Sequence, residues 1–131
     1  MRTETAAAAK ETVLLAEDEE IVRRLVVELL LRAGFQVLAA ANGELALETA
    51  RTYAGPIHLL ISDVAMPAMT GLELARRIGN LYPQIKILLV SGYSDPAAID
   101  DLKQQAGFAY LRKPFTPQML LEQARALLEV S

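Results

Sequence analysis

Short apolar runs alternate with longer mixed segments along the whole chain. The runs cover residues 12–16, 35–40, 57–62, 85–90 and 108–111. Those at 57–62 and 85–90 are nearly continuous in apolar residues, which is typical of strands that are buried on both faces of a parallel sheet. The pattern therefore predicts five short strands in such a sheet.

The segments between the runs carry apolar residues at the spacing of amphipathic helices. The core-facing stripe predicted for the first helix is Ile21, Leu25, Leu29 and Ala33, and later stripes are Leu74, Ile78, Leu81 and Leu121, Ala124, Leu128. Helix ends are marked as well, by Gly34 and Gly107 after the first and fourth predicted helices and by the cap pairs Asp95-Pro96 and Thr116-Pro117.

Strand and helix alternate five times, which predicts a doubly wound α/β fold with a five-stranded parallel sheet, five flanking helices and right-handed crossovers. We expect residues 1–10 to form a flexible lead-in and residues 11–131 to form one domain, which leaves no room for a second. In open sheets of this kind, ligands bind beyond the carboxyl ends of the strands. Those ends are therefore where chemistry is expected.

Composition narrows the possible functions. Hydrophobic residues make up 53% of the chain and charged residues 22%, which indicates a folded domain and not a disordered one. The net charge of −3 argues against a general nucleic-acid binder. The absence of cysteine excludes disulfides, cysteine–metal sites and thiol nucleophiles, and the single histidine, His58, excludes a multi-histidine metal site. No transmembrane run or secretory peptide is recognised, so a cytoplasmic location is expected.

Charged and hydroxyl side chains stand at the predicted strand ends. The first strand is followed by an acidic run, 17–20, the third by Asp63, the fourth by Ser91 and the fifth by Lys113. Carboxylates gathered on one rim repel one another and favour a cation, and an all-oxygen ligand set suits Mg²⁺. Together with a lysine and a hydroxyl, they form a candidate site for phosphoryl transfer.

Four stretches in this order and spacing carry a family resemblance: residues 14–19 (LLAEDE), 63–71 (DVAMPAMTG), 91–92 (SG) and 113–115 (KPF). With them the chain resembles the receiver domains of two-component response regulators over about residues 11–129. The resemblance implies a CheY-like, flavodoxin-like sheet with strand order 2-1-3-4-5.

The resemblance assigns a role to each matching residue. Asp63 corresponds to the phosphoacceptor, Glu17 and Asp18 to the acidic pair that holds Mg²⁺, and the backbone carbonyl of Ala65 to a further metal ligand. The commonest pattern has two aspartates where this chain has Glu17 and Asp18. Glutamate is longer by one methylene, so Glu17 is expected to reach the ion through a water molecule.

The remaining assignments concern the switch. Ser91 corresponds to the hydroxyl that reaches the phosphoryl group, where threonine is commoner, and Lys113 to the lysine that pairs with that group. Tyr110 corresponds to the aromatic switch residue, and the Lys113–Pro114 peptide is expected to be cis. A face built from the fourth helix, fifth strand and fifth helix would then change its affinity for partners.

Simpler structural roles compete with these assignments. Asp18 is also suited to cap the first helix, and Glu19 and Glu20 are better explained by the helix dipole than by metal binding. Asp63 would pass for a turn residue were it not followed by the proline loop. Tyr110 could be a half-buried strand aromatic, and His58, inside a strand, is expected to be structural.

The outer face of the first helix raises a docking hypothesis. On a helical wheel Val27 and Leu31 fall opposite the predicted core stripe and beside Arg23 and Arg24. Two apolar residues four positions apart on an outer face suggest contact with a partner helix, and the resemblance places the histidine-bearing phosphodonor there. The alternative is two scattered surface residues.

The expected function is phosphoryl acceptance on Asp63, with Mg²⁺, from a histidine kinase or a histidine phosphotransfer protein. The domain is expected to assist its own phosphorylation and dephosphorylation without turning over an external substrate. The sequence leaves the oligomeric state open, with a phosphorylation-dependent homodimer as one alternative. The segments 91–94 (SGYS) and 113–117 (KPFTP) resemble those of receivers attached to hybrid sensor histidine kinases. A stand-alone response regulator and a pseudo-receiver that only binds proteins remain alternatives.

Overall fold

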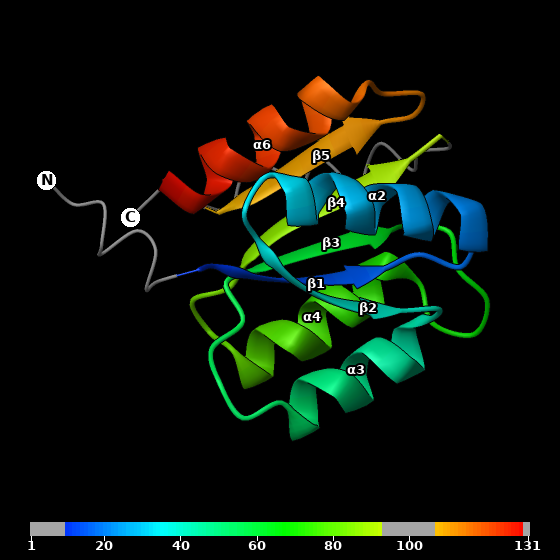
Figure 1. Ribbon diagram of the computed structural model, residues 1–131. Helices are drawn as coiled ribbons and strands as arrows, with labels where there is room; N and C mark the ends of the chain where they lie inside the picture. Colours follow the sequence, from blue (N-terminus) through cyan, green and yellow to red (C-terminus); the bar gives the residue numbers. More distant parts are fainter. Residues whose placement is uncertain (1–9, 93–106, 130–131) are drawn as a thin grey trace, which may run out of the picture.

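The computed structural model describes residues 10–92 and 107–129. Five parallel strands form one sheet in the order β2-β1-β3-β4-β5, which confirms the predicted topology (Figure 1). The strands are β1 (Thr12–Ala16), β2 (Gln36–Ala40), β3 (Leu59–Asp63), β4 (Lys86–Ser91) and β5 (Phe108–Arg112). Each observed strand lies within two residues of the run that predicted it.

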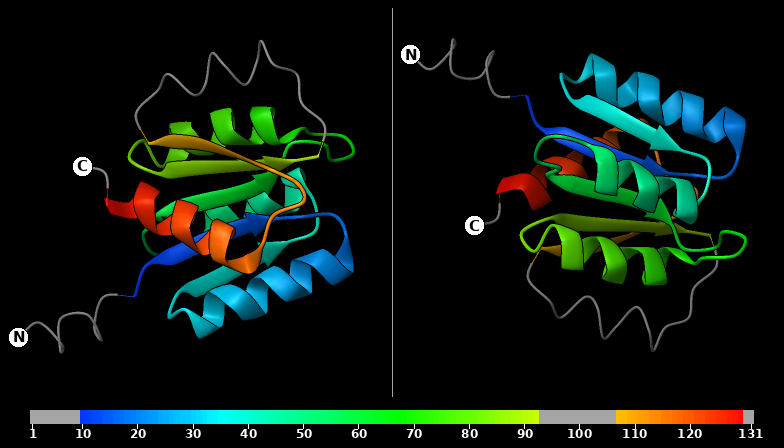
Figure 2. Two further views of the ribbon diagram at one scale, coloured as in Figure 1. Left: turned by 90° about the horizontal axis from the view of Figure 1, so that it is seen from above. Right: turned by 90° about the horizontal axis from the view of Figure 1, so that it is seen from below.

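Helices cover both faces of the sheet. One face carries α2 (Glu20–Arg32) and α6 (Pro117–Glu129), and the other carries α3 (Gly43–Thr52) and α4 (Gly71–Leu81) (Figures 1 and 2). The helix predicted between residues 95 and 107 lies outside the described residues. In the described part of the chain, no helix has the length and apolar character needed to cross a bilayer.

The central strands β1 and β3 are more deeply buried than the edge strand β2. Every residue of β1 and β3 is buried, whereas the edge strand β2 exposes Gln36 and Ala39. Two apolar cores result, one under α2 and α6 and one under α3 and α4. A sheet packed on both faces cannot easily shift register, so the carboxyl ends of its strands are held in fixed relative positions.

The core-facing stripe predicted for the first helix is wrong at Ile21 and Leu25, whereas Leu29 and Ala33 pack against the core as predicted. Ile21 and Leu25 are 75% and 66% exposed, and the core is instead filled by Val26 and Leu30. Most residues of α2 are Ile, Leu or Val, so several stripes fit the helical period equally well. The buried residues Val26 and Leu30 each follow a residue of the predicted stripe by one position, and Val27 packs against the core, which removes it from the outer face.

Helix ends agree better with the sequence. The Thr116 side chain accepts a hydrogen bond from the Met119 amide at 3.1 Å, just before α6 begins at Pro117, as predicted. Gly34, with φ of 98°, ends α2 in the left-handed region that favours glycine.

His58 has a structural role, as expected. Its ring nitrogen Nδ1 accepts a hydrogen bond from the Thr12 amide, and its own amide donates to the Thr12 carbonyl, both at 2.9 Å. The imidazole thus supplies an acceptor to a buried backbone amide where β1 begins. It lies at the amino end of the sheet, away from the rim described next.

Candidate functional site

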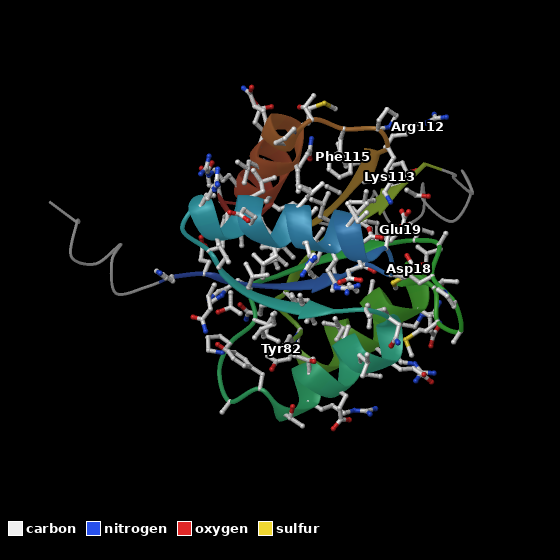
Figure 3. All side chains as sticks on the ribbon, turned by 45° about the vertical axis from the view of Figure 1, so that its right-hand side comes forward. Asp18, Glu19, Tyr82, Arg112, Lys113 and Phe115 are labelled. Atoms are coloured by element: carbon white, nitrogen blue, oxygen red, sulfur yellow. The ribbon has the colours of Figure 1, made fainter. Side chains whose placement is uncertain are left out.

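The carboxyl ends of β1, β3, β4 and β5 meet on one rim of the sheet. The residues there are Glu17, Asp63, Ser91 and Lys113, each at or directly after the end of its strand. Figure 3 shows Asp18, Glu19 and Lys113 on this rim, with Lys113 facing the acidic loop after β1. The predicted site residues from four separate strands are therefore brought together.

Three carboxylates form a cluster on the rim. Glu17, Asp18 and Asp63 each offer one oxygen, and these oxygens all lie within 4.8 Å of one another. Glu17 and Asp63 are buried, whereas Asp18 is exposed. All three ligands are hard oxygens with one side open to solvent, which fits Mg²⁺ and leaves room for water in its coordination shell.

The alternative role of Asp18 as a helix cap is not what the structure shows. The N-cap of α2 is Glu19, which makes no side-chain capping bond, and the helix begins at Glu20. Asp18 thus precedes the helix and is not needed to cap it. Glu20 lies in the first turn, where its charge favours the helix dipole, as expected.

The surroundings of Glu17 disfavour the charged form of its carboxyl group. Burial raises the pKa of its carboxyl above the usual value, and this outweighs the hydrogen bond that its Oε2 accepts from the Glu19 amide at 3.0 Å. Asp63 and Asp18 raise it further, while Lys113 opposes them. A bound cation would favour the charged form, so this group is suited to a site that holds one.

Lys113 lies against the carboxylate cluster. Its ammonium is 3.0 Å from Asp63 Oδ2 and 3.6 Å from Glu17 Oε1. Burial lowers the pKa of Lys113, but the hydrogen bond and charge of Asp63, together with Glu17, outweigh it and leave the pKa above its usual value. The lysine is therefore positively charged at neutral pH. The peptide that follows, Lys113–Pro114, is cis, as the resemblance implied.

Asp63 is held at both carboxylate oxygens. Oδ1 accepts a hydrogen bond from the Ala65 amide at 3.1 Å, and Oδ2 accepts one from Lys113. The Val64 amide donates to the Val90 carbonyl at 2.9 Å, which ties the loop after β3 to β4. These contacts hold the carboxylate in a fixed position on the rim.

The loop that carries Asp63 closes on Gly71, the first residue of α4. A Cβ at Gly71 would lie 2.3 Å from the Asp63 carbonyl oxygen, and the Gly71 amide donates to the Val64 carbonyl at 2.9 Å. The backbone of β3 and the start of α4 therefore touch, and only glycine fits between them. The last residue of the predicted motif is required for packing.

Gly71→Ala is expected to lower the free energy of unfolding by about 1–3 kcal/mol, because the added methyl overlaps backbone that cannot move aside. Gly79→Ala, in the same helix, is the matched control, since nothing lies within 4 Å of its added Cβ. That control should gain about 1 kcal/mol from helix propensity. Urea unfolding followed by circular dichroism measures both, and equal shifts in the two variants would contradict the predicted contact.

Ser91 and Tyr110 are joined through the backbone. Ser91 is buried at the end of β4, and its carbonyl oxygen accepts hydrogen bonds from the Tyr110 hydroxyl at 3.2 Å and from the Lys113 amide at 3.0 Å. Tyr110 and Lys113 thus share one acceptor, which Ser91 supplies. A shift of the backbone at Ser91 would be felt at both partners.

An apolar groove of about 730 Å³ runs from this rim along α2. Its lining includes Val22, Leu25 and Leu29 of the helix and, at the rim, Lys113 and Phe115. Leu31, named in the docking hypothesis, is exposed but is not among the lining residues, and Val27 is half-buried against the core. The large apolar side chain of α2 that is exposed in this groove is therefore Leu25, which the sequence analysis assigned to the interior.

One contact at the site was missed by the sequence analysis. The Arg23 guanidinium donates a hydrogen bond to the carbonyl oxygen of Glu17 at 3.0 Å. Nothing in the sequence distinguishes Arg23 from its neighbour Arg24, because both fall on the polar side of the predicted helix. Its contact becomes visible only when the true rotation of α2 is known.

A doubly wound sheet in this strand order, with three carboxylates and a lysine on its carboxyl rim, defines the class of CheY-like receiver proteins. Comparison with known families agrees: residues 13–125 match the response regulator receiver domain family. The chain belongs to that family.

Similar proteins include both attached and separate receivers. The chain is 40% identical over 118 residues to the sensor kinase CckA of Brucella abortus, covering 90% of this chain but only 12% of the kinase. It is 36% identical over 116 residues to the response regulator receiver protein CpdR of the same organism, covering 88% of this chain and 95% of CpdR. The chain thus corresponds to a small part of one relative and to nearly all of the other.

Solved structures give the same result. The receiver domain of the hybrid histidine kinase CckA superimposes with a TM-score of 0.77 at 35% identity, covering 90% of this chain and 99% of that one. The chemotaxis protein CheY4 of Vibrio cholerae gives a TM-score of 0.81 at 31% identity, covering 91% and 99%. The fold and the predicted family are both confirmed.

Proposed function

We propose that this receiver domain accepts a phosphoryl group on Asp63 from a phosphohistidine, with Mg²⁺ required. The observation that carries the proposal is the position of the Asp63 carboxylate, held between the Lys113 ammonium at 3.0 Å and the Ala65 amide at 3.1 Å, beside Glu17 and Asp18. Receiver domains take phosphoryl groups from histidine kinases or histidine phosphotransfer proteins, so a protein of one of these kinds is the expected donor.

The chemistry needs few protein groups. An oxygen of Asp63 attacks phosphorus, a P–O bond forms, the P–N bond to the donor imidazole breaks, and the nitrogen keeps its electron pair. Lys113 is placed to pair with the phosphoryl oxygens as it gives up its contact with Asp63. Glu17, Asp18 and Asp63, with the carbonyl of Ala65, would hold Mg²⁺, which offsets negative charge on the transferring group when bound.

Rival functions fit the site less well. A flavin mononucleotide binder of the same topology needs a phosphate-binding loop after β1, where this chain has an acidic run, 17–20, that would repel phosphate. A dehalogenase-type phosphatase needs a second aspartate two residues after the first, and that position is Ala65. A pseudo-receiver that only binds proteins would normally have lost Asp63 or Lys113. Both residues are present here, and they are in contact.

The output is proposed to be a change of protein affinity. The Tyr110 hydroxyl is tied to the Ser91 carbonyl, and Ser91 lies one position beyond the residue that pairs with Asp63 across β3 and β4. If the Ser91 hydroxyl moves toward a phosphoryl group on Asp63, the backbone that Tyr110 contacts moves with it. This is a shift between two states, and it changes the surface that the domain offers to another protein or to a second copy.

Biological context is proposed from the similar proteins. The resemblance to the CckA receiver favours a receiver that belongs to a hybrid sensor histidine kinase, in the cytoplasm, with the domain spanning residues 11–131. CpdR, which this chain matches over nearly its whole length, supports the alternative of a stand-alone regulator. Direct binding to nucleic acid or membrane is not part of the proposal.

The donor is proposed to dock on α2 along the groove that leads to the rim. Because the donor histidine must reach Asp63, its helix has to lie close to the site, and the groove connects Leu25 with Lys113. Leu25 offers an exposed apolar side chain for that contact, in place of the pair Val27 and Leu31.

Leu25→Asp is expected to slow phosphotransfer from the cognate donor by about 10-fold, because a charge would replace a central apolar contact. Labelling by acetyl phosphate, which needs no docking surface, should stay unchanged. Leu45→Asp, on α3 and also exposed, is the matched control and should affect neither rate. Equal donor rates in the Leu25 and Leu45 variants would rule out this surface as the docking site.

A further inference from the structure

Arg23 differs from the other described arginines of α2. Arg24 and Arg32 pair with glutamates one helical turn back, Glu20 and Glu28, on exposed surface. Arg23 is half-buried, and its guanidinium donates a hydrogen bond to the carbonyl oxygen of Glu17, six residues earlier, outside the helix. Its side chain therefore reaches over the N-terminus of the helix to the acidic loop.

That bond completes a set of three that hold the loop. The Glu17 amide donates to the Ala40 carbonyl at 3.1 Å, which continues the β1–β2 ladder beyond the strand. The Glu19 amide donates to Glu17 Oε2 at 3.0 Å. Arg23 holds the remaining polar group, the Glu17 carbonyl, at 3.0 Å. The loop is thus held at three groups of Glu17: its amide, its side chain and its carbonyl.

The Glu17 carbonyl belongs to the peptide that leads into Asp18. Fixing that carbonyl fixes the plane of the peptide up to the Asp18 Cα, so only rotation within Asp18 itself remains to change the position of its carboxylate. Asp18 is exposed and is the member of the cluster least held by packing. Its carboxylate stays within 4.8 Å of the other two oxygens only if the loop keeps its shape.

We propose that Arg23 is a positioning residue for the divalent-cation site: it holds the Glu17 carbonyl so that the Asp18 carboxylate remains in the cluster. The inference rests on the proposed function, because it takes the cluster to be a cation site. The contact through which Arg23 would act is its hydrogen bond to the backbone of the loop.

Charge and positioning make opposite predictions for Arg23. A guanidinium near three carboxylates repels a divalent cation, so its removal would strengthen cation binding if charge alone mattered. If Arg23 positions the loop, its removal frees Asp18 and weakens binding, by roughly 10-fold, as is typical when a residue that supports a metal ligand is lost. The direction of the change therefore separates the two effects.

The test uses Mn²⁺, which prefers the same oxygen ligands as Mg²⁺ and whose free concentration is measured by electron paramagnetic resonance. Arg23→Ala should bind Mn²⁺ about 10-fold more weakly than wild type, and Arg23→Lys, which keeps the charge but has a shorter donor, should fall between them. Arg24→Ala is the matched control, since it removes the same charge from the next residue, and it should not weaken binding.

Thermal melts of each variant separate lost binding from lost folding, and Arg23→Lys serves if Arg23→Ala does not fold. Mn²⁺ affinity in Arg23→Ala equal to or above that of Arg24→Ala would overturn the proposal. The proposed function fails in a different way: wild type and Asp18→Asn would then bind Mn²⁺ equally, and the positioning role would fall with it. If Asp18→Asn binds weakly and Arg23→Ala binds normally, only the positioning role is wrong.

Discussion

Asp63→Asn is expected to abolish phosphorylation by both the histidine donor and acetyl phosphate. An amide oxygen is a far weaker nucleophile than a carboxylate oxygen. The carboxylate that lies 3.0 Å from the Lys113 ammonium is that of Asp63, so the substitution removes the expected acceptor of the phosphoryl group. Asparagine has nearly the same shape, so the hydrogen bond from the Ala65 amide to Oδ1 can be kept. Loss of label should therefore come without loss of fold.

The measurement is transfer of radiolabelled phosphoryl from the donor, with circular dichroism as the control for folding. Removing a negative charge from a crowded cluster relieves repulsion on Glu17, whose pKa is raised by burial and by Asp63. The variant should accordingly be as stable as wild type or more so. Residual labelling of Asp63→Asn at the wild-type rate would show that another residue accepts the phosphoryl group.

Lys113→Ala is expected to slow phosphorylation by about 10²–10³-fold, the usual effect of removing one group that stabilises developing charge. The lysine is the only cation that the described structure places within 4.0 Å of Asp63, and its raised pKa keeps it charged at neutral pH. Lys113→Arg should not restore the rate, because the planar guanidinium is larger and cannot occupy the space of an ammonium.

Cation binding gives the control for this prediction. Without Lys113, Glu17 and Asp63 lose the positive charge that lies 3.6 and 3.0 Å away, so Mn²⁺ should bind Lys113→Ala at least as tightly as wild type. A slow variant that binds the metal well would locate the defect in the transfer step. If Lys113→Ala is phosphorylated at the wild-type rate, the assigned role of the lysine is wrong.

The fold and the heart of the site could be predicted from the sequence because both depend on strands. Nearly continuous apolar runs mark β3 and β4, and in a parallel sheet their carboxyl ends must share a rim. Once the runs were found, Asp63 and Lys113 were expected on the same rim, although 50 residues separate them. Their motif context then identified the family.

Helix rotation could not be predicted in the same way. The helix α2 is rich in Ile, Leu and Val, so a shift of one residue changes which of Leu25 and Val27 faces the core, and the sequence gives no reason to prefer either. The structure turns Leu25 outward and Val27 toward the core. The same rotation brings Arg23 to the Glu17 carbonyl, which explains why that contact was missed.

The most direct test of the central claim is the intact mass of the protein after incubation with acetyl phosphate, with and without Mg²⁺. If Asp63 accepts the phosphoryl group, the mass rises by one phosphoryl group in the presence of Mg²⁺. This gain is absent when the metal is chelated before labelling, and it is absent in Asp63→Asn. A protein that gains no mass in any condition, or that gains it equally without Mg²⁺ or without Asp63, would contradict the central claim.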